Sequence, residues 1–166
     1  MTVTTEDLEQ VTRAMNAVRH IVRALRVSSR MIETRMGISG AQLFVLQQLR
    51  EKPAESLNEL ADRTATHQSS VSVVVRRLVE RGLVARTTAT ADRRRVELSL
   101  TDAGRRLLAG APVTVQEKML EGAESLSAAE RRQMADLLSR WVRASGLEDG
   151  EPPLLFDDLS DSTDAS

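Results

Sequence analysis

The chain has 166 residues, 41% of them hydrophobic and 28% charged, which suits one ordinary domain with a real core. It contains no cysteine, so disulfide scaffolds, thiol nucleophiles and cysteine-ligated zinc are excluded. Its two histidines, His20 and His67, have no Asp or Glu at metal-ligand spacing, so we expect no catalytic residue, no metal and no cofactor. No apolar run approaches the roughly 20 residues of a membrane span, and the N-terminus lacks the features of a signal peptide. A cytoplasmic protein without membrane contact is expected.

The net charge of −1 conceals an uneven distribution of charged residues. Seven of the 24 acidic residues and none of the 23 basic ones follow residue 146, so residues 1–146 carry a net charge of +6. Ten arginines and only four acidic residues lie between Arg63 and Arg106. A positive excess confined to one segment is typical of an element that binds a polyanion.

A long amphipathic helix is predicted before this basic segment, between a cap at Thr4 and a stop at Gly37. Its apolar residues follow alternating spacings of three and four with one step missed at Ser29, and they are Leu8, Val11, Met15, Val18, Val22, Leu25, Ile32 and Met36. This stripe could pack on its own domain or on a second copy of the chain.

Three short helices follow, and their turns indicate a helix-turn-helix. The first begins at the capping box Ser39–Gln42 and closes at Pro53, and the second begins at another capping box, Ser56–Glu59. The third is predicted over residues 67–81 and is stopped by Gly82.

The third of these helices divides into two faces on a helical wheel. One side is apolar and consists of Val71, Val74, Val75 and Leu78. The other side presents Ser69, Ser72, Val73, Arg76 and Glu80. Serine can reach phosphates or base edges, arginine can grip guanine, and valine can contact a thymine methyl, which is the chemistry of a major-groove reader. An ordinary solvated surface helix would carry similar residues.

Residues 83–87 and 96–100 are predicted to form two short strands joined by an arginine-rich tip, which contains Arg93, Arg94 and Arg95. Asp92 can pair with Arg94 and pre-set its side chain. An arginine held in this way suits insertion into a narrow minor groove, although a solvated charged turn would have the same composition.

Two further helical segments are predicted after the hairpin. Thr101 caps a helix that Pro112 kinks or divides, and the capping box Ser127–Glu130 opens a last helix that ends at Gly146. The remaining segment is rich in Asp, Ser and Pro and is expected to be mostly disordered.

The run from Leu43 to Gly104 resembles the winged helix-turn-helix of the MarR family of bacterial transcription regulators. The resemblance rests on LNELADRT, HQSSVSVVVRRLVERGLVAR and ADRRRVELSLTDAG, and with the flanking helices it covers about residues 5–146. It implies a mainly α fold with a small β-wing, in which a winged helix-turn-helix domain is joined to a helical dimerisation region. The expected division is a dimerisation helix at 1–36, a DNA-binding domain at 37–101, dimerisation helices at 102–146 and an acidic disordered tail at 147–166.

The resemblance also implies a non-enzymatic homodimer that binds double-stranded DNA at a pseudo-palindromic operator. Members are usually repressors and release DNA when a small phenolic or lipophilic ligand binds. Carried over by position, the DNA-binding residues are Gln68, Ser69, Ser70, Ser72, Val73, Arg76 and Arg77 on the recognition helix, and Asp92, Arg93, Arg94 and Arg95 on the wing. Val73 and Arg76 depart from the family's common residues, so the base preference does not transfer.

The sequence leaves other interpretations open. The same basic surface would suit a sequence-tolerant architectural DNA-binding protein, and the helix-turn-helix or the acidic tail could instead hold a protein partner. The tail could also fold back on the arginine-rich surface, or it could be plain solubilising disorder. The residues that could approach an effector pocket are His20, Arg23, Met31, Met36 and Trp141, although core packing would explain the apolar ones equally well.

Overall fold

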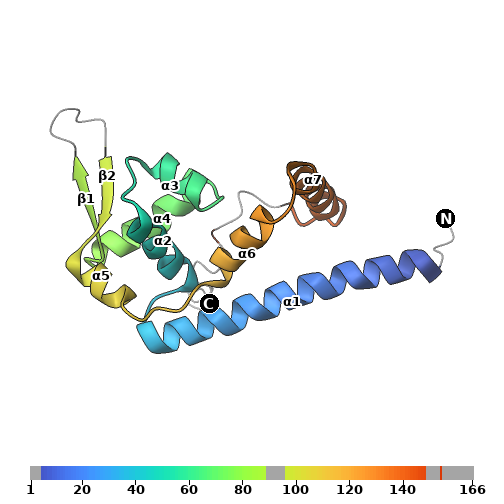
Figure 1. The fold of residues 1–166 in the computed structure, drawn as a ribbon, viewed down its shortest axis with the longest axis horizontal. Coiled ribbons are helices and arrows are strands. Elements are labelled where there is room, and N and C mark those ends of the chain that lie inside the picture. Colours follow the sequence, from blue (N-terminus) through green and yellow to red (C-terminus); the bar gives the residue numbers. More distant parts are fainter. Residues whose placement is uncertain (1–4, 89–95, 149–153, 155–166) are drawn as a thin grey trace, which may run out of the picture.

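The computed structural model describes residues 5–88, 96–148 and 154. Within them the chain forms, in order, α1 (Thr5–Met36), α2 (Gly40–Glu51), α3 (Leu57–Arg63), α4 (Gln68–Glu80), β1 (Val84–Thr88), β2 (Val96–Leu100), α5 (Asp102–Leu108), α6 (Val115–Glu124) and α7 (Ala128–Ala144). Figure 1 shows α2 to α5 and the two strands gathered at one end, while α1, α6 and α7 extend away from them. We call residues 38–108 the winged-helix unit. The predicted mainly α fold with a small β-wing is confirmed.

α1 is amphipathic along its length, but its buried residues all lie in its C-terminal half. Leu25 and Ile32 are buried where this half packs against α2 and α6. Leu8, near the other end, is 59% exposed. Gly37 ends the helix with φ +64°, a left-handed conformation that glycine adopts without strain. The cap predicted at Thr4 lies outside the described residues.

The start of α2 follows the predicted capping box. The Ser39 hydroxyl accepts a hydrogen bond from the Gln42 backbone N–H at 3.1 Å, and the Gln42 Oε1 accepts one from the Ser39 N–H at 3.1 Å. These bonds satisfy two N–H groups that a helix start otherwise leaves unpaired. The helix ends at Glu51, just before Pro53, as expected.

The second predicted capping box forms only in part. The Ser56 hydroxyl accepts from the Glu59 N–H at 3.0 Å, as a capping box requires. The Glu59 carboxylate, however, accepts from the Glu55 N–H at 2.7 Å instead of from Ser56. The reciprocal bond is therefore shifted by one residue, from the Ser56 N–H to the Glu55 N–H.

The wing is a short antiparallel hairpin in which Val84 pairs with Leu100 and Thr88 with Val96. The first strand begins at Val84, one residue later than predicted. Ala54 adds a further pairing: it donates to the Leu98 carbonyl at 2.9 Å and accepts from the Leu98 N–H at 2.8 Å. This bridge ties the segment after α2 to the second strand of the hairpin.

Three helices follow the hairpin within the described residues. α5 is capped by the Thr101 hydroxyl, as predicted, and it packs against α2 and β2 on the winged-helix unit. It ends at Leu108, and Pro112 lies in the connection to α6, so the helical segment is divided. α6 begins with a capping box between Thr114 and Glu117 that was not predicted.

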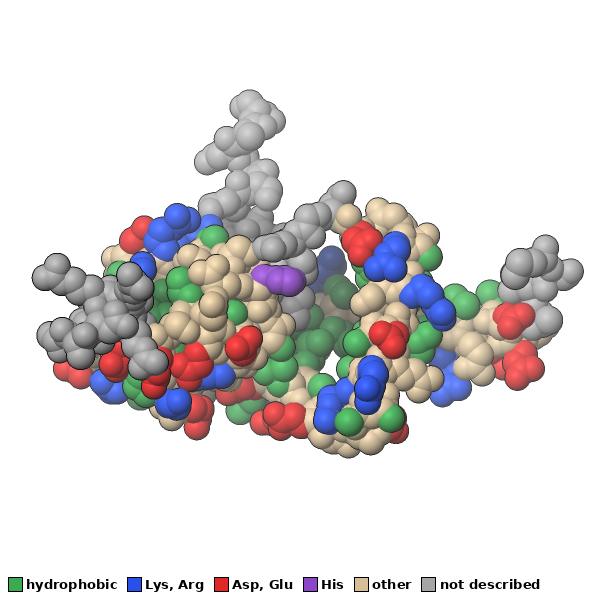
Figure 2. All heavy atoms as spheres, turned by 90° about the horizontal axis from the view of Figure 1, so that it is seen from above, with side chains coloured by type: hydrophobic (Ala, Val, Ile, Leu, Met, Phe, Trp, Pro, Cys, Tyr) green, Lys and Arg blue, Asp and Glu red, His purple; other side chains and the backbone are tan. Residues whose placement is uncertain are grey.

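α7 begins at the predicted capping box of Ser127 and Glu130, and Gly146 follows its end with φ +65°. None of its seventeen residues, all of which the structure describes, is buried within the protomer. Its apolar residues are between 36% and 47% exposed, and they are Met134, Leu137, Leu138, Trp141 and Val142. Figure 2 shows hydrophobic side chains at the surface of this part of the molecule, to the right, among arginines and lysines.

The hydrophobic core lies in the winged-helix unit. Phe44, Leu60 and Leu78 are among its fully buried side chains, and Ile32 of α1 closes it on one side. Leu154 also belongs to this core and is only 4% exposed, although it lies in the segment that was expected to be disordered.

Candidate DNA-binding surface

α4 has the two faces that its sequence predicts. The side that packs into the core consists of Val71, Val74, Val75 and Leu78, all of them buried. The side that was assigned to DNA remains at the surface: Gln68, Ser69 and Arg76 are exposed, and Ser70, Ser72, Val73 and Arg77 are half-buried. The structure therefore presents seven of the predicted site residues along one helix.

The turn that leads into α4 is held by backbone and hydroxyl hydrogen bonds. The Thr64 hydroxyl donates to the Leu60 carbonyl at 2.9 Å, which closes the end of α3. Ala65 then adopts φ +50°, a left-handed conformation that is uncommon for alanine. His67 is the N-cap residue of α4 but makes no side-chain capping bond. The sharp turn between α3 and α4 thus depends on backbone geometry at a non-glycine residue.

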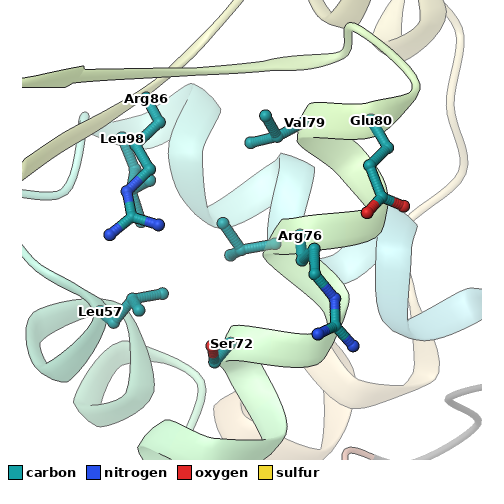
Figure 3. Close-up of a pocket in the computed structure, with 8 residues that line it drawn as sticks. Leu57, Ser72, Arg76, Val79, Glu80, Arg86 and Leu98 are labelled. Carbon is teal, nitrogen blue, oxygen red and sulfur yellow. The ribbon is translucent and has the colours of Figure 1, made fainter.

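A hollow of about 330 Å³ opens beside α4, between α3 and the hairpin (Figure 3). Leu57, Val79 and Leu98 give it apolar walls, and Ser72 stands at its edge. Arg86, on β1, extends its guanidinium group across from Arg76 of α4. Two cations thus flank one depression on the face that α4 presents.

The charges on this surface are weakly neutralised by the protein itself. Among the described residues, neither Arg76 nor Arg86 has a carboxylate oxygen within 4 Å. Arg81, at the end of α4, donates to the Gln42 Oε1 at 3.4 Å and so links α4 to α2. A surface with unpaired arginines attracts anions, because the positive potential is not cancelled locally.

Glu59 is the acidic group of this region whose pKa departs from its usual value. The hydrogen bond from the Glu55 backbone N–H lowers its pKa, and the nearby Lys52 and Arg63 act in the same direction. Partial desolvation opposes the shift. The charged form of Glu59 is therefore favoured in the folded protein.

The described residues lack two further kinds of feature. They contain no group of three or more His, Cys, Asp or Glu side chains placed to hold a metal ion. None of the helices in the described part of the chain combines the length and the apolar character needed to cross a membrane.

Comparisons with known proteins identify the family of the chain. Residues 38–96 match the model of the MarR family. A putative transcriptional regulatory protein for the hcr operon of Thauera aromatica is 33% identical over 132 residues, which cover 80% of this chain and 77% of that protein. The chain belongs to the MarR family. It is thus a member of a family of non-enzymatic, DNA-binding transcription regulators.

Two further proteins extend this result. The HTH-type transcriptional repressor MdtR of Bacillus subtilis is 38% identical over 81 residues, which cover 48% of this chain and about half, 52%, of that protein. The crystal structure of Sco3205, a MarR family regulator from Streptomyces coelicolor in complex with DNA, has a TM-score of 0.56 at 22% identity. That alignment covers 94% of this chain and 96% of Sco3205, so the similarity in fold includes the helices that flank the winged-helix unit.

The remaining predicted residues of this MarR family member fall into two groups. The wing residues Asp92, Arg93, Arg94 and Arg95 lie outside the described residues. The five effector candidates are not gathered within one protomer: His20 and Met36 are sixteen residues apart on α1, a distance of about 24 Å along the helix. Met36 packs against the core, whereas Trp141 is exposed on α7.

Arg86 was not among the predicted site residues, although the hairpin register accounts for its position. It pairs with Leu98 across the sheet, and directly paired residues have their side chains on the same face. Because Leu98 faces the core beside α4, Arg86 is directed to the same side as the recognition helix. The strand pairing, had it been known, would have identified this cation.

Proposed function

We propose that the protein is a homodimeric MarR family regulator, most simply a repressor, that binds a pseudo-palindromic operator. The observation that carries the proposal is α4, whose inner face is fully packed while its outer face presents serines, a valine and arginines. This combination suits contacts to base edges in the major groove, with arginines supplying affinity through phosphates.

The dimer is proposed from the uncovered faces of α1 and α7. The large apolar side chains of α7 and most of those in the N-terminal half of α1 remain exposed in the described part of the protomer. Burial of apolar surface stabilises an interface by about 25 cal/mol per Å². A second copy of the chain carries an identical stripe, which can pair with the first about a two-fold axis. Residues 1–36 and 102–146 would supply this interface, although α5 packs on the winged-helix unit.

The wing is proposed to place Arg94 in the minor groove on each side of the operator, with Asp92 orienting it and with Arg93 and Arg95 on flanking phosphates. A two-fold dimer presents two recognition helices, so two half-sites about one helical turn apart are expected. Such a regulator would act in the cytoplasm, where its DNA is. Release by a small lipophilic ligand is part of the proposal, with a pocket formed only in the dimer.

The test is fluorescence anisotropy of the full chain on DNA from upstream of its own gene and on a scrambled duplex of equal length. We expect the upstream DNA to bind at least about 10³-fold more tightly at near-physiological salt. Arg94→Ala should remove most of that preference, whereas Arg77→Ala should weaken both duplexes equally and reduce the salt slope by about 1. Equal binding of both duplexes by the unmodified protein would favour an architectural role instead, and no binding at low salt would favour a protein partner.

A further inference from the structure

Leu154 brings the C-terminal end of the chain back to the winged-helix unit. Its side chain is 4% exposed and belongs to the hydrophobic core, whose other buried members lie between residues 32 and 108. α7 stands away from that core (Figure 1), and its last residue is Ala144. One apolar side chain that follows α7 in the sequence is therefore buried in the same core as the winged-helix unit.

The segment beyond this anchor has the opposite charge to the surface of the winged-helix unit. Residues 155–166 contain no Lys or Arg and four acidic residues, which are Asp157, Asp158, Asp161 and Asp164. Between Arg63 and Arg106 the chain has an excess of six positive charges. Arg76 and Arg86, on the presented face, have no carboxylate within 4 Å among the described residues.

The segment beyond the anchor is long enough to reach that face. The inner side of α4 contributes Val71, Val74 and Leu78 to the same core that contains Leu154. The outer side of α4 lies one helix diameter, about 10–12 Å, from the side that faces this core. Twelve extended residues span up to about 40 Å, so residues 155–166 are long enough to cross α4 from an attachment at the core.

We propose that residues 155–166 dock on the arginine-bearing face of α4 in the DNA-free protein and compete with DNA for it. This inference rests on the proposed DNA-binding function, because the surface in question is the one assigned to the operator. Tethering at Leu154 gives the segment an effective concentration in the millimolar range, so that even a weak electrostatic contact is populated. The contact is screened by salt, since it joins exposed charges.

The decisive comparison is between two sets of four charge-neutralising substitutions in the full chain. The tail variant carries Asp157→Asn, Asp158→Asn, Asp161→Asn and Asp164→Asn. The matched control carries Glu51→Gln, Glu55→Gln, Asp102→Asn and Glu148→Gln, which are exposed acids outside α1, α4, α6 and α7 and change the net charge by the same amount. We expect the tail variant to bind operator DNA about tenfold more tightly at low salt and the control to change affinity less than twofold. Equal gains for both variants, or none for the tail variant, would overturn the proposal.

A second variant tests the anchor without changing any charge. Leu154→Ser should release the segment and lower its effective concentration, so DNA binding should tighten by a fraction of the gain in the tail variant. Leu154→Met, which keeps the apolar contact, should bind DNA like the unmodified protein. An unchanged affinity for Leu154→Ser, in a protein whose melting shows that it is folded, would contradict the anchoring role.

A measurement without DNA separates this proposal from the proposed function. Backbone amide NMR shifts of Ser72 and Arg76 should differ between the unmodified protein and the tail variant at low salt, and the difference should vanish at high salt. Identical spectra would refute docking even if operator binding is specific. Altered spectra in a protein that shows no operator preference would leave the docking intact and remove the operator function.

Discussion

Gly104 in α5 lies so close to the carbonyl oxygen of Leu83 that a Cβ atom on residue 104 would overlap it. The same carbonyl accepts a hydrogen bond from the Thr101 N–H at 3.2 Å, and the Thr101 hydroxyl donates to the Gly82 carbonyl at 2.7 Å. The start of α5 is therefore locked against the turn that follows α4. This contact fixes where the wing leaves the recognition helix.

Gly104→Ala is expected to destabilise the protein by roughly 2–4 kcal/mol, because backbone must move to make room for one methyl group. Urea unfolding followed by circular dichroism measures the effect. Gly122→Ala is the matched control, since a Cβ there meets nothing within 4 Å and α6 is helical at that point. It should leave stability unchanged or raise it by up to about 1 kcal/mol. Similar losses of stability for both variants would show that the close approach of Gly104 to the Leu83 carbonyl does not cause the destabilisation.

Exchange of glycine and alanine should change the stability of the protein in opposite directions in the turn before α4 and in the turn after it. Ala65→Gly relieves a left-handed φ of +50° and should raise the free energy of unfolding by up to about 1 kcal/mol. Gly82→Ala introduces a side chain at φ +66° and should lower it by about 1–2 kcal/mol, although no atom lies near the new Cβ. Thermal melting of the two variants checks both signs, and a loss of stability in Ala65→Gly would contradict the strain argument.

Arg76→Ala should reduce the affinity for operator DNA by about 1–3 kcal/mol and relax the preference between operator variants in the bases that α4 faces. Arg140→Ala is the control, because Arg140 is an exposed arginine on α7, far along the chain from the recognition helix. It should change DNA affinity little. Competition anisotropy with a panel of single-base operator variants separates a loss of specificity from a uniform loss of affinity.

Glu59 is expected to make part of the stability depend on pH. Its pKa is lowered in the folded protein, so its ionised form stabilises the fold at pH values above its ordinary pKa of about 4.5. That contribution is lost as the pH falls through the lower, folded pKa. The unfolding free energies of the unmodified protein and of Glu59→Gln should therefore differ most at pH values above the unfolded pKa and converge as the pH falls below the folded pKa. A constant difference across this range would mean that the carboxylate charge is not involved.

The apolar stripe of α7 is expected to hold the dimer. Leu137→Asp places a charge on that stripe and should yield a folded protein that sediments as a monomer and binds operator DNA weakly. Ser139→Asp, on the opposite side of the same helix, should remain dimeric. Sedimentation velocity measures both, and a dimeric Leu137→Asp would place the interface elsewhere.

Local signals in the sequence were sufficient for most of the helices. Capping boxes at Ser39 and Ser127 and the glycines at 37, 82 and 146 act through bonds and dihedral angles within a few residues, so their effects are visible in sequence. The division of α4 was predictable for the same reason, because helical periodicity alone assigns Val71, Val74, Val75 and Leu78 to one side.

Contacts between distant residues were not predictable in this way. The pairing of Ala54 with Leu98 joins residues 44 positions apart, and no periodic pattern in the sequence indicates it. Leu154 has acidic and proline-rich neighbours that indicate disorder, and only the core that receives it accounts for its burial. The shifted bond of Glu59 depends on where the Glu55 N–H lies, which is a matter of loop geometry. Arg86 was missed for the same reason, because it comes to lie beside α4 through contacts between residues that are distant in the sequence.

No residue of α7 is buried within the described part of the protomer. This affects how the occupancy of an operator would depend on the cellular concentration of the regulator. If pairing of two chains is needed to cover this helix, the amount of active species at low concentration grows with the square of the number of chains. Occupancy of an operator would then rise more steeply than for a monomeric binder. A modest fall in expression would release the DNA, and a modest rise would restore repression, without any ligand.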